Sequence, residues 1–512
     1  MMLPNVIIEN ARLRGRQPAI LDDEGTFTWS QFTDRVARAA GMLRAMGLRP
    51  GERFAIVMRN GFRHAELLWA GYWAGIVPVP INWRLSPVEI AAILEDSGAK
   101  LVAASGEFVP MMENPALAPW RERVLAVEAA SGEIAQYEGL LAAATAAPVH
   151  ESREHDDAIL LYTGGTTGRS KGVRLTHANI IADGWQNGLA LGIRPGDIYL
   201  HVAPMFHSAD LNGTACFMLG CGHAYLAQFT PSGISAAIAR HRPTVTNLVP
   251  TMVKMIADAP DAGEFDLASL RLIYYGSSPM PLEWLNAARA RLPGVAWHQG
   301  YGLTETSPIL TTMDGDAHER CFRSGDAARL RSVGTPVVGV QMRIVDHEDR
   351  ELGAGETGEV VVRGPNVSPG YFNRDEENAR AFRGGWFHTG DVGRLDEDGY
   401  LTLVDRIKDV IITGGENVYS TEVEAALFRH PDIAEAAVIG VPDDALGEAL
   451  YAVIACRPGK SLTAEEVIAH CRPLIGGFKI PRRMDFVDAL PRTALGKVQK
   501  NVLRRKYGGH RG

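Results

Sequence analysis

A glycine-rich stretch from residue 162 to 172 has the composition of a loop that binds a polyphosphate. It reads Tyr-Thr-Gly-Gly-Thr-Thr-Gly-Arg-Ser-Lys-Gly. Its glycines let the backbone approach an anion closely, because no Cβ atom intervenes and a positive φ costs little. Hydroxyl groups add hydrogen-bond donors, and Arg169 and Lys171 add positive charge. The candidate binding residues are Thr163, Gly164, Gly165, Thr166, Thr167, Gly168 and Lys171.

This stretch differs from the P-loop of nucleoside triphosphatases. That motif needs Gly-x-x-x-x-Gly-Lys-Ser/Thr at the start of a helix, whereas Lys171 is followed by Gly172 and an apolar run typical of a strand. Apolar residues at 159–161 and 173–175 predict strands on both sides, and a helix is predicted to begin at 177. Taken alone, the stretch also fits an ordinary turn, so its function depends on the rest of the chain.

Further polar residues follow predicted strands in the second half of the chain. Residues 272–276 predict a strand that ends at Gly276, before Ser277 and Ser278, and α/β proteins bind ligands at such strand ends. Residues 301–306, Tyr-Gly-Leu-Thr-Glu-Thr, place an aromatic ring, a hydroxyl and a carboxylate close together. Asp391 ends another motif, and an ionised carboxylate can accept hydrogen bonds from both hydroxyls of a ribose.

The C-terminal part of the chain contains charged and glycine-rich turns. Residues 405–409, Asp-Arg-Ile-Lys-Asp, are typical of a hinge or of a solvated linker. A strand predicted at 410–413 leads into Gly-Gly-Glu-Asn at 414–417, and Thr421 with Glu424 predicts a capping box that opens a helix. Residues 491–497 predict an exposed turn that carries Lys497, before a basic helix from 498 to 506.

The remaining elements predict a layered α/β protein. Thr28 with Gln31 predicts a capping box and a helix, followed by a strand at 53–58, a helix at 64–74 and a strand at 76–81. This alternation favours parallel strands. The aromatic residues of the 64–74 helix are expected in the core. Strands at 246–251, 436–441 and 450–456, and a helix capped by Thr463 and Glu466, complete the prediction.

Composition limits the classes of protein that remain. At 512 residues the chain is too long for one core, and its 46% hydrophobic and 22% charged residues are typical of a soluble protein. The net charge of -8 argues against a general nucleic-acid binder. The five cysteines include no Cys-x-x-Cys pair, which favours a reducing, cytoplasmic location. We expect no signal peptide and no integral membrane segment, because the most apolar run, 67–81, is short and interrupted by prolines.

Five of these motifs occur in the order and spacing of one family. The chain resembles the adenylate-forming enzymes, and among them the acyl-CoA synthetases, over residues 162–497. The resemblance implies a large N-terminal α/β domain of several subdomains (1–404), a hinge (405–408) and a small mobile C-terminal α+β domain (409–512). Its reaction has two steps. A carboxylate attacks the α-phosphate of Mg-ATP to form an acyl-adenylate and pyrophosphate, and coenzyme A then displaces AMP.

The resemblance also implies a role for each motif. The loop from Thr163 to Lys171 would cover the β- and γ-phosphates of ATP, and Lys408 would be the hinge residue. His207 would form a wall of the acid pocket at the carboxylate end, although a buried structural histidine is the alternative. The other implied roles are adenine binding by Gly276, Ser277, Ser278, Tyr301 and Gly302, α-phosphate binding by Thr304, Mg2+ binding by Glu305, ribose binding by Asp391 and Arg406, bridging of acid and α-phosphate by Lys497, and presentation of Gly414, Gly415, Glu416 and Asn417 beside the pantetheine of CoA.

The chain departs from the common family pattern at a few positions. Gly164 and Ser170 stand where serine and proline are usual, which would slow closure of the loop without abolishing phosphate binding. Ser420 stands where proline is usual. No nucleotide-binding or lysine position is lost, which argues against a non-catalytic relative.

The sequence leaves the acid and the acceptor open. The acid pocket is expected at 207–213, 249–252, 275–278 and 302–307. Asp210 would repel an anionic tail unless a basic residue compensates for its charge, and the sequence identifies no such residue. The expected substrate is therefore a medium-chain fatty acid or an aromatic or alicyclic acid. Transfer to a carrier-protein phosphopantetheine, a non-catalytic ATP or AMP sensor and a luciferase-like oxygenase are the alternatives. The expected partners are a small carboxylic acid, ATP and CoA, without nucleic acid, and a homodimer is compatible with the sequence.

Overall fold

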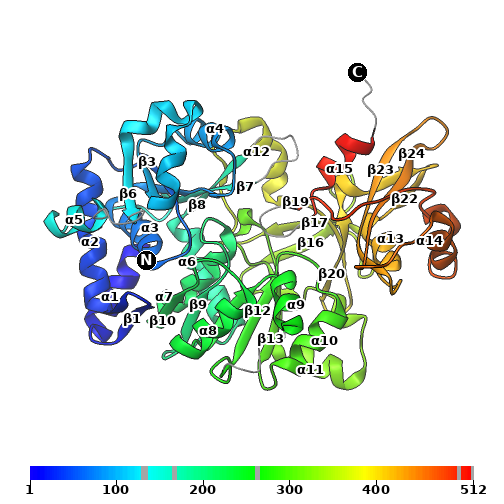
Figure 1. Ribbon diagram of the computed structural model, residues 1–512, viewed down its shortest axis with the longest axis horizontal. Coiled ribbons are helices and arrows are strands. Elements are labelled where there is room, and N and C mark those ends of the chain that lie inside the picture. Colours follow the sequence, from blue (N-terminus) through cyan, green and yellow to red (C-terminus); the bar gives the residue numbers. More distant parts are fainter. Residues whose placement is uncertain (129–135, 164–169, 260–265, 493–497, 509–512) are drawn as a thin grey trace. The chain divides into compact units, whose positions relative to one another are not determined.

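The structure is a computed structural model that describes residues 1–128, 136–163, 170–259, 266–492 and 498–508. The chain divides into two compact units. The larger comprises Met1–Gln341 and Val362–Phe387, and the smaller comprises Met342–Val361 and His388–Gly512. Figure 1 labels their helices and strands. Of the predicted site residues, Gly164, Gly165, Thr166, Thr167, Gly168 and Lys497 lie outside the described residues.

The larger unit contains a nine-stranded sheet with a parallel centre. The strand order is β15-β14-β13-β12-β11-β9-β10-β1-β2. Its parallel strands are β1 (Pro18–Asp22), β9 (Ile198–His201), β10 (Gly222–Tyr225), β11 (Val245–Leu248), β12 (Leu272–Gly276) and β13 (Ala296–Tyr301). Antiparallel pairings add β2 (Gly25–Thr28), β14 (Thr311–Met313) and β15 (Thr335–Pro336) at the edges.

Alternating side chains bury both faces of this sheet. Ile273 and Tyr275 of β12 pack with helices α8 (Pro231–His241), α9 (Pro250–Asp258) and α10 (Leu282–Arg291). Leu272 and Tyr274 of the same strand pack on the other side, with α7 (Thr214–Leu219). Two buried faces are expected for parallel strands. Figure 1 shows α8, α9 and α10 beside β12 and β13.

A second sheet in the larger unit is entirely parallel. Its order is β4 (Val77–Pro80), β3 (Arg53–Val57), β5 (Val102–Ser105) and β6 (Val124–Glu128). Helices α2 (Trp29–Ala45) and α3 (Phe62–Ala74) cover one face, and α4 (Pro87–Ser97) covers the other. The predicted parallel α/β layers and the capping box of Thr28 are confirmed. Helices α1 (Leu3–Arg14), α5 (Gln136–Ala143), α6 (His177–Ala190) and α11 (Gly315–Ser324) complete the α-helices that the structure describes in this unit before residue 341.

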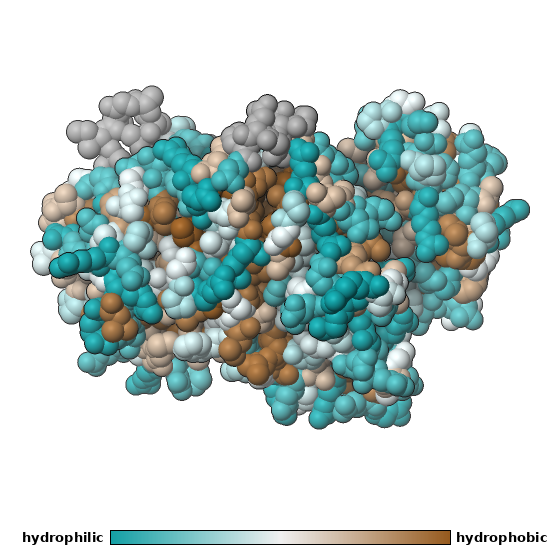
Figure 2. Space-filling view, turned by 90° about the horizontal axis from the view of Figure 1, so that it is seen from below, coloured by the Kyte–Doolittle hydropathy of each residue, from teal (hydrophilic) through white to brown (hydrophobic). Residues whose placement is uncertain are grey.

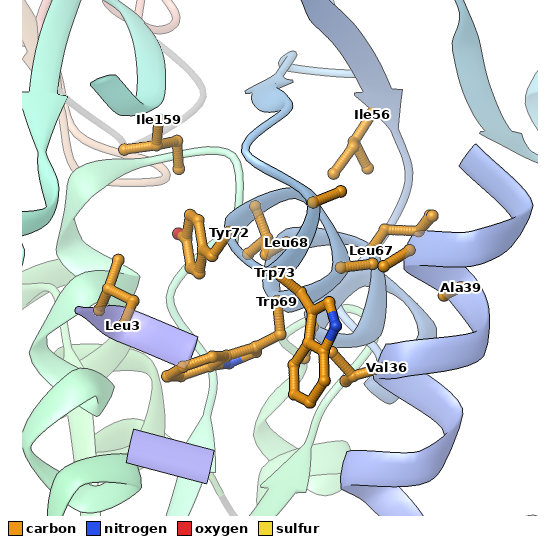
Figure 3. Close-up of a cluster of buried hydrophobic side chains, with 14 of the residues drawn as sticks. Leu3, Val36, Ala39, Ile56, Leu67, Leu68, Trp69, Tyr72, Trp73 and Ile159 are labelled. Carbon is orange, nitrogen blue, oxygen red and sulfur yellow. The ribbon is translucent and has the colours of Figure 1, made fainter. Parts of the chain in front are cut away.

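Helix α3 is buried on all sides. Trp69, Tyr72 and Trp73 are each less than a tenth exposed. Figure 3 shows these rings among Leu3, Val36 and other apolar side chains from neighbouring elements. The prediction that these aromatic residues belong to the core is therefore confirmed.

The glycine-rich stretch joins two strands of a small antiparallel sheet. The order is β18 (Gly370–Tyr371), β8 (Lys171–Thr176) and β7 (Asp157–Thr163). Thr163 and Lys171 are register partners, so the stretch connects a β-hairpin. The strands predicted on both sides of it, and the helix predicted from 177, are confirmed by β7, β8 and α6 (His177–Ala190). Helix α12 (Asp375–Ala381) follows β18.

The smaller unit contains two sheets. One has the order β16 (Gln341–Val345), β17 (Gly358–Arg363), β19 (Phe387–Leu395) and β20 (Leu401–Arg406). The other has the order β22 (Glu416–Val418), β21 (Ile411–Thr413), β24 (Gly447–Cys456) and β23 (Ile433–Asp443), with β25 (Arg483–Phe486) also paired to β24. Helices α13 (Ser420–Leu427) and α14 (Ala464–Cys471) pack against one face of β23, and α15 (Lys500–Tyr507) packs against the other. Figure 1 shows these helices on opposite sides of the sheet.

Two local predictions were wrong. The strand predicted at 246–251 ends at Leu248, because Pro250 begins helix α9. The predicted capping box of Thr421 and Glu424 is absent, since α13 starts at Ser420 and no side chain caps it. Thr421 instead donates its hydroxyl to the carbonyl oxygen of Val404, and Glu424 pairs with Lys500 at 2.7 Å. Both side chains thus bond residues distant in sequence and not the start of their own helix. The predicted capping box of Thr463 and Glu466 is present.

The predicted domain limits remain a prediction. The smaller compact unit also includes residues 342–361 and 388–404, which the sequence assigned to the N-terminal domain. The hinge predicted at 405–408 coincides with the end of β20 and the 3-10 turn η8 (Ile407–Asp409).

Across the part of the chain that the structure describes, no helix is long and apolar enough to cross a bilayer. Figure 2 shows a face on which hydrophilic residues predominate and apolar residues gather in small patches.

Candidate functional site

Two predicted binding segments leave adjacent parallel strands of the nine-stranded sheet. Gly276 of β12 and Gly300 of β13 are register partners, so Ser277, just beyond β12, and Tyr301, the last residue of β13, lie at neighbouring strand ends. A Cβ atom at Gly276 would lie 2.4 Å from the carbonyl oxygen of Gly300, and one at Gly302 would lie 1.6 Å from that of Pro308. The close backbone approach therefore requires glycine at 276 and 302. The carboxyl ends of parallel strands are the usual ligand edge of such a sheet, as the sequence predicted.

Thr304 and Glu305 form a short 3-10 turn, η5 (Thr304–Thr306), directly beyond β13. Both residues are less than a tenth exposed. The Thr304 Oγ1 atom lies 3.0 Å from the Oγ atom of Ser208, which follows His207. Tyr371 donates its hydroxyl to Glu305 Oε1 at 2.8 Å. The fold thus joins the turn after β13 to the His207 segment and to β18.

Lys171 belongs to the same group of side chains. Its Nζ atom lies 2.9 Å from Glu377 Oε2 and 5.3 Å from the centroid of the Tyr371 ring. Tyr371 therefore lies between the cation of Lys171 and the carboxylate of Glu305. The sequence patterns did not identify Tyr371 or Glu377, because both lie in a segment without a recognisable chemical motif and reach the site only through the pairing of β18 with β8.

Buried polar side chains hold the turn that carries Thr304 and Glu305. The Ile309 amide donates to Asp183 Oδ1 at 3.0 Å, and Asn366 Nδ2 donates to the carbonyl oxygens of Thr306 and Ile309. The Ser368 amide donates to the Glu305 carbonyl at 2.8 Å. Burial raises the pKa of Asp183 well above its usual range. These residues position the turn, and no local sequence signal indicates them.

His207 lies at the start of the 3-10 helix η3 (Ser208–Gly213). Its Nδ1 atom accepts a hydrogen bond from the Ala209 amide at 3.3 Å, so the neutral ring carries its proton on Nε2. The ring is half-buried. The structure therefore gives His207 a capping role in η3, beside the Ser208 contact with Thr304.

The Asp210 carboxylate, which was expected to repel an anionic acid, is hydrogen-bonded in the structure. Asp210 Oδ1 lies 2.7 Å from His201 Nδ1, and His201 Nε2 lies 3.0 Å from His223 Nδ1. Burial holds the pKa of His223 well below its usual range, so His223 is neutral. Asp210 thus has a hydrogen-bond partner, His201, that the sequence did not indicate. Asp210 also lines a cavity of about 30 Å³ together with Trp69 and Phe217.

Asp391 and Arg406 are paired within the smaller unit. They are register partners on the antiparallel strands β19 and β20, with Arg406 Nε 2.5 Å from Asp391 Oδ1. Asp391 is only 5% exposed, and its amide donates to Thr389 Oγ1 at 3.1 Å. The structure therefore brings together the two residues that were predicted to bind a ribose.

The predicted hinge lies between two anchored aspartates. Asp405 Oδ2 accepts hydrogen bonds from the amide and hydroxyl of Ser420, and Asp409 Oδ1 lies 2.7 Å from Arg504 Nη2. Lys408 is exposed on η8, and partial burial of its amine lowers its pKa while Asp409 opposes this effect. The backbone between these aspartates carries the predicted pivot.

Gly414 and Gly415 form the two-residue turn between β21 and β22. Thr413 and Glu416 are register partners, and φ is 59° at Gly414 and 83° at Gly415. A two-residue hairpin turn with positive φ at both positions favours glycine. The turn and Glu416 are exposed, as expected for a segment that contacts a substrate.

The residues around Glu305 suit a magnesium ion that is held partly by substrate phosphates. They do not suit a metal ion whose ligands all come from the protein. Within the described ranges, no three side chains of His, Cys, Asp or Glu gather closely enough to hold a metal ion. Mg2+ commonly uses one or two carboxylates together with substrate phosphates and water. The buried carboxylate of Glu305, which accepts a hydrogen bond from Tyr371, fits that arrangement.

Comparison with known proteins identifies the family. The family model of the AMP-binding enzymes matches residues 7–372, and that of the AMP-binding enzyme C-terminal domain matches residues 422–497. A feruloyl-CoA synthase of Amycolatopsis sp is 37% identical over 98% of both chains. A fatty acid–acyl-carrier-protein ligase, ScoC, of Streptomyces coeruleorubidus is 34% identical over 96% of this chain and 94% of that protein.

The fold agrees with solved structures of such enzymes. The o-succinylbenzoate CoA synthetase of Bacillus subtilis, solved in complex with its acyl-adenylate intermediate, has a TM-score of 0.85 and 30% identity over 99% of both chains. The predicted resemblance and the predicted α/β fold class, with a large N-terminal and a small C-terminal part, are confirmed. The chain therefore belongs to the AMP-binding enzyme family, the adenylate-forming enzymes that include the acyl-CoA synthetases.

Proposed function

We propose that this protein is an acid–thiol ligase that uses ATP to convert a carboxylic acid into its CoA thioester. The observation that carries the proposal is the group Lys171, Thr304, Glu305 and Tyr371 at the ligand edge of the nine-stranded sheet. In the first step a carboxylate oxygen attacks the α-phosphorus of ATP, and pyrophosphate leaves. In the second step the CoA thiol attacks the acyl carbon, and AMP leaves with the electron pair of the broken bond.

Both reactants of the first step are anions, so the site must supply positive charge and hydrogen-bond donors. Lys171 would bind the β- and γ-phosphates with the loop 163–168, and the Thr304 hydroxyl would donate to the α-phosphate. Glu305 would hold Mg2+, which supplies further charge neutralisation to the phosphates. Gly276, Ser277, Ser278, Tyr301 and Gly302 would bind the adenine.

The smaller unit would contribute residues to both steps. Asp391, supported by Arg406, would bind the ribose hydroxyls, and Lys497 would bridge the acid and the α-phosphate. Rotation about Lys408 would replace Lys497 by the turn from Gly414 to Asn417 for the second step. Because Asp405 accepts hydrogen bonds from Ser420, which lies beyond the predicted hinge, this rotation would have to break those bonds.

We propose an aromatic acid as the first substrate class to test. The likeness to a feruloyl-CoA synthase supports this choice, and medium-chain fatty and alicyclic acids follow. The acid would lie near His207, between the segments 207–213, 249–252, 275–278 and 302–307. The pairing of Asp210 with His201 means that diacids also belong in the test panel.

Transfer to a carrier protein is the second candidate. The likeness to ScoC, a ligase for an acyl carrier protein, favours it. A non-catalytic nucleotide sensor is the remaining alternative. It would not need the buried, hydrogen-bonded turn that carries Thr304 and Glu305. Homodimer formation and a cytoplasmic location remain proposals that sedimentation and fractionation would test.

The first experiment measures pyrophosphate release and thioester formation with a panel of aryl, fatty, alicyclic and dicarboxylic acids. Lys497→Ala is assayed beside the wild type, with either free acid or pre-formed acyl-adenylate. We expect the variant to lose at least about a hundredfold in adenylation and to keep the thioester step. Adenylation without any CoA thioester would favour a carrier protein as the acceptor. Absence of pyrophosphate release with every acid would refute the proposed ligase activity.

A further inference from the structure

We propose that Glu377 is the counter-ion that Lys171 exchanges for the phosphates of ATP, so that Glu377 lowers the affinity for ATP. This inference rests on the proposed function, because it takes Lys171 as a phosphate-binding residue. It assigns a role to a carboxylate that belongs to no motif of the chain.

The geometry places Glu377 directly against the predicted phosphate ligand. Its Oε2 atom is 2.9 Å from Lys171 Nζ and is shielded from solvent, although the side chain as a whole is 25% exposed. Lys171 is 21% exposed and lies over the Tyr371 ring. In the absence of nucleotide, the charge of Lys171 is therefore neutralised within the protein.

Binding of ATP changes this balance. A polyphosphate that contacts Lys171 must either replace Glu377 or come within a few ångströms of its negative charge. Like charges at such distances repel, and the repulsion is stronger where water is excluded. The same carboxylate also raises the pKa of Arg374, after the larger effect of the Asp96 hydrogen bond, so its field extends over the start of α12.

Contacts that do not involve Glu377 hold both ends of this region in place. Asn378 accepts a hydrogen bond from the Tyr371 amide at 2.7 Å and donates to the Tyr371 carbonyl at 2.9 Å. Arg374 Nη2 bonds Asp96 Oδ1 at 2.6 Å. The Asn378 bonds join α12 to β18, and the Arg374 bond joins the residue before α12 to α4. We therefore expect the charge of Glu377 to affect the affinity for ATP more than the folding of the protein.

The test is direct measurement of Mg-ATP binding by the full-length protein without any acid, using calorimetry with a non-hydrolysable ATP analogue. We expect Glu377→Gln to tighten binding roughly two- to fivefold, the size of a partly exposed ion pair. The difference should shrink as salt is raised, because screening weakens both the pair and the repulsion. Thermal unfolding of both proteins checks that the variant is folded.

The chain offers a matched control on the same helix. Glu376→Gln removes the same charge from the first turn of α12, where residue 376 is exposed, and should leave ATP binding unchanged. Lys171→Met should weaken ATP binding. Adding Glu377→Gln to that variant should produce no tightening, because the double-mutant cycle isolates the interaction between Lys171 and Glu377.

Three results would overturn the inference: unchanged or weaker binding by Glu377→Gln, equal tightening by Glu376→Gln, or tightening that persists in the Lys171→Met background. Absence of ATP binding by the wild type is a different result, because it would refute the proposed function itself.

Discussion

The Tyr371 hydroxyl donates a hydrogen bond to Glu305 Oε1 at 2.8 Å, and so links strand β18 to the turn beyond β13. The two residues are far apart in the sequence, and both belong to the larger unit. The bond fixes one carboxylate oxygen of Glu305. It also places the Tyr371 ring beside Lys171.

Removal of this bond should weaken the use of magnesium. In Tyr371→Phe the Glu305 carboxylate loses a charge-assisted hydrogen bond. The free energy of such a bond corresponds to a reduction of the adenylation rate by about tenfold. The concentration of Mg2+ needed for half-maximal rate should also rise. Pyrophosphate release measured across a magnesium titration checks this, with Tyr400→Phe as the control, and an unchanged titration curve would contradict the role assigned to Tyr371.

Asn366 should affect both stability and rate. Asn366→Ala leaves the carbonyl oxygens of Thr306 and Ile309 without their buried donor, so the free energy of unfolding should fall by about 1–3 kcal/mol. The adenylation rate should fall more than the affinity for ATP, because the turn that carries Thr304 and Glu305 is displaced. Denaturant unfolding and single-turnover kinetics measure the two effects. The exposed Asn501→Ala is the control, and loss of stability with a normal rate would make Asn366 purely structural.

The Gly414–Gly415 turn should matter only for the second step. Alanine at 415 must adopt a φ near 83°, which costs about 1–2 kcal/mol, while nothing lies within 4 Å of the added Cβ atom. We expect thioester formation from pre-formed acyl-adenylate to slow several-fold and adenylation to stay normal. Gly459→Ala imposes a similar strain, with φ of 75° and free space, on a turn outside the proposed site. Equal effects of the two variants on the thioester step would exclude a specific role for the 414–415 turn.

Stability should decrease in mild acid. Burial lowers the pKa of His64, His177 and His298 to about 4, below the value near 6.5 of an unfolded histidine. The unfolded state therefore binds more protons between these values, so the stabilising contribution is complete above pH 6.5 and is lost as pH falls toward 4.

Thermal unfolding measured from pH 7.5 to 5 checks this decrease in a range where most carboxylates stay ionised. His298→Asn should flatten the curve, whereas His155→Asn should leave it unchanged, since the His155 side chain is 81% exposed. A midpoint that is constant between pH 7 and 5 would contradict the assigned histidine states.

Sequence patterns predicted the elements whose causes are local. The capping boxes at Thr28 and Thr463, the strands on both sides of the glycine-rich stretch and the burial of Trp69 all follow from short-range spacing and hydrophobicity. The glycines at 276 and 302 were named through the family resemblance, and the structure adds the close backbone approach that requires glycine there. Local patterns failed where a residue distant in sequence bonded the side chain. Thr421 bonds Val404 and Glu424 pairs with Lys500, so neither caps its helix.

By itself the sequence determined the family, the order of the motifs and the residue types that can bind a nucleotide, because these depend on chemical groups at fixed spacing along the chain. Only the tertiary structure decided which side chains support them. Tyr371 reaches Glu305, Glu377 reaches Lys171 and His201 reaches Asp210. Two of these contacts join segments far apart in the chain, and all three depend on how strands pair and helices pack. Their energies come from burial and from charges brought together, which no linear pattern contains.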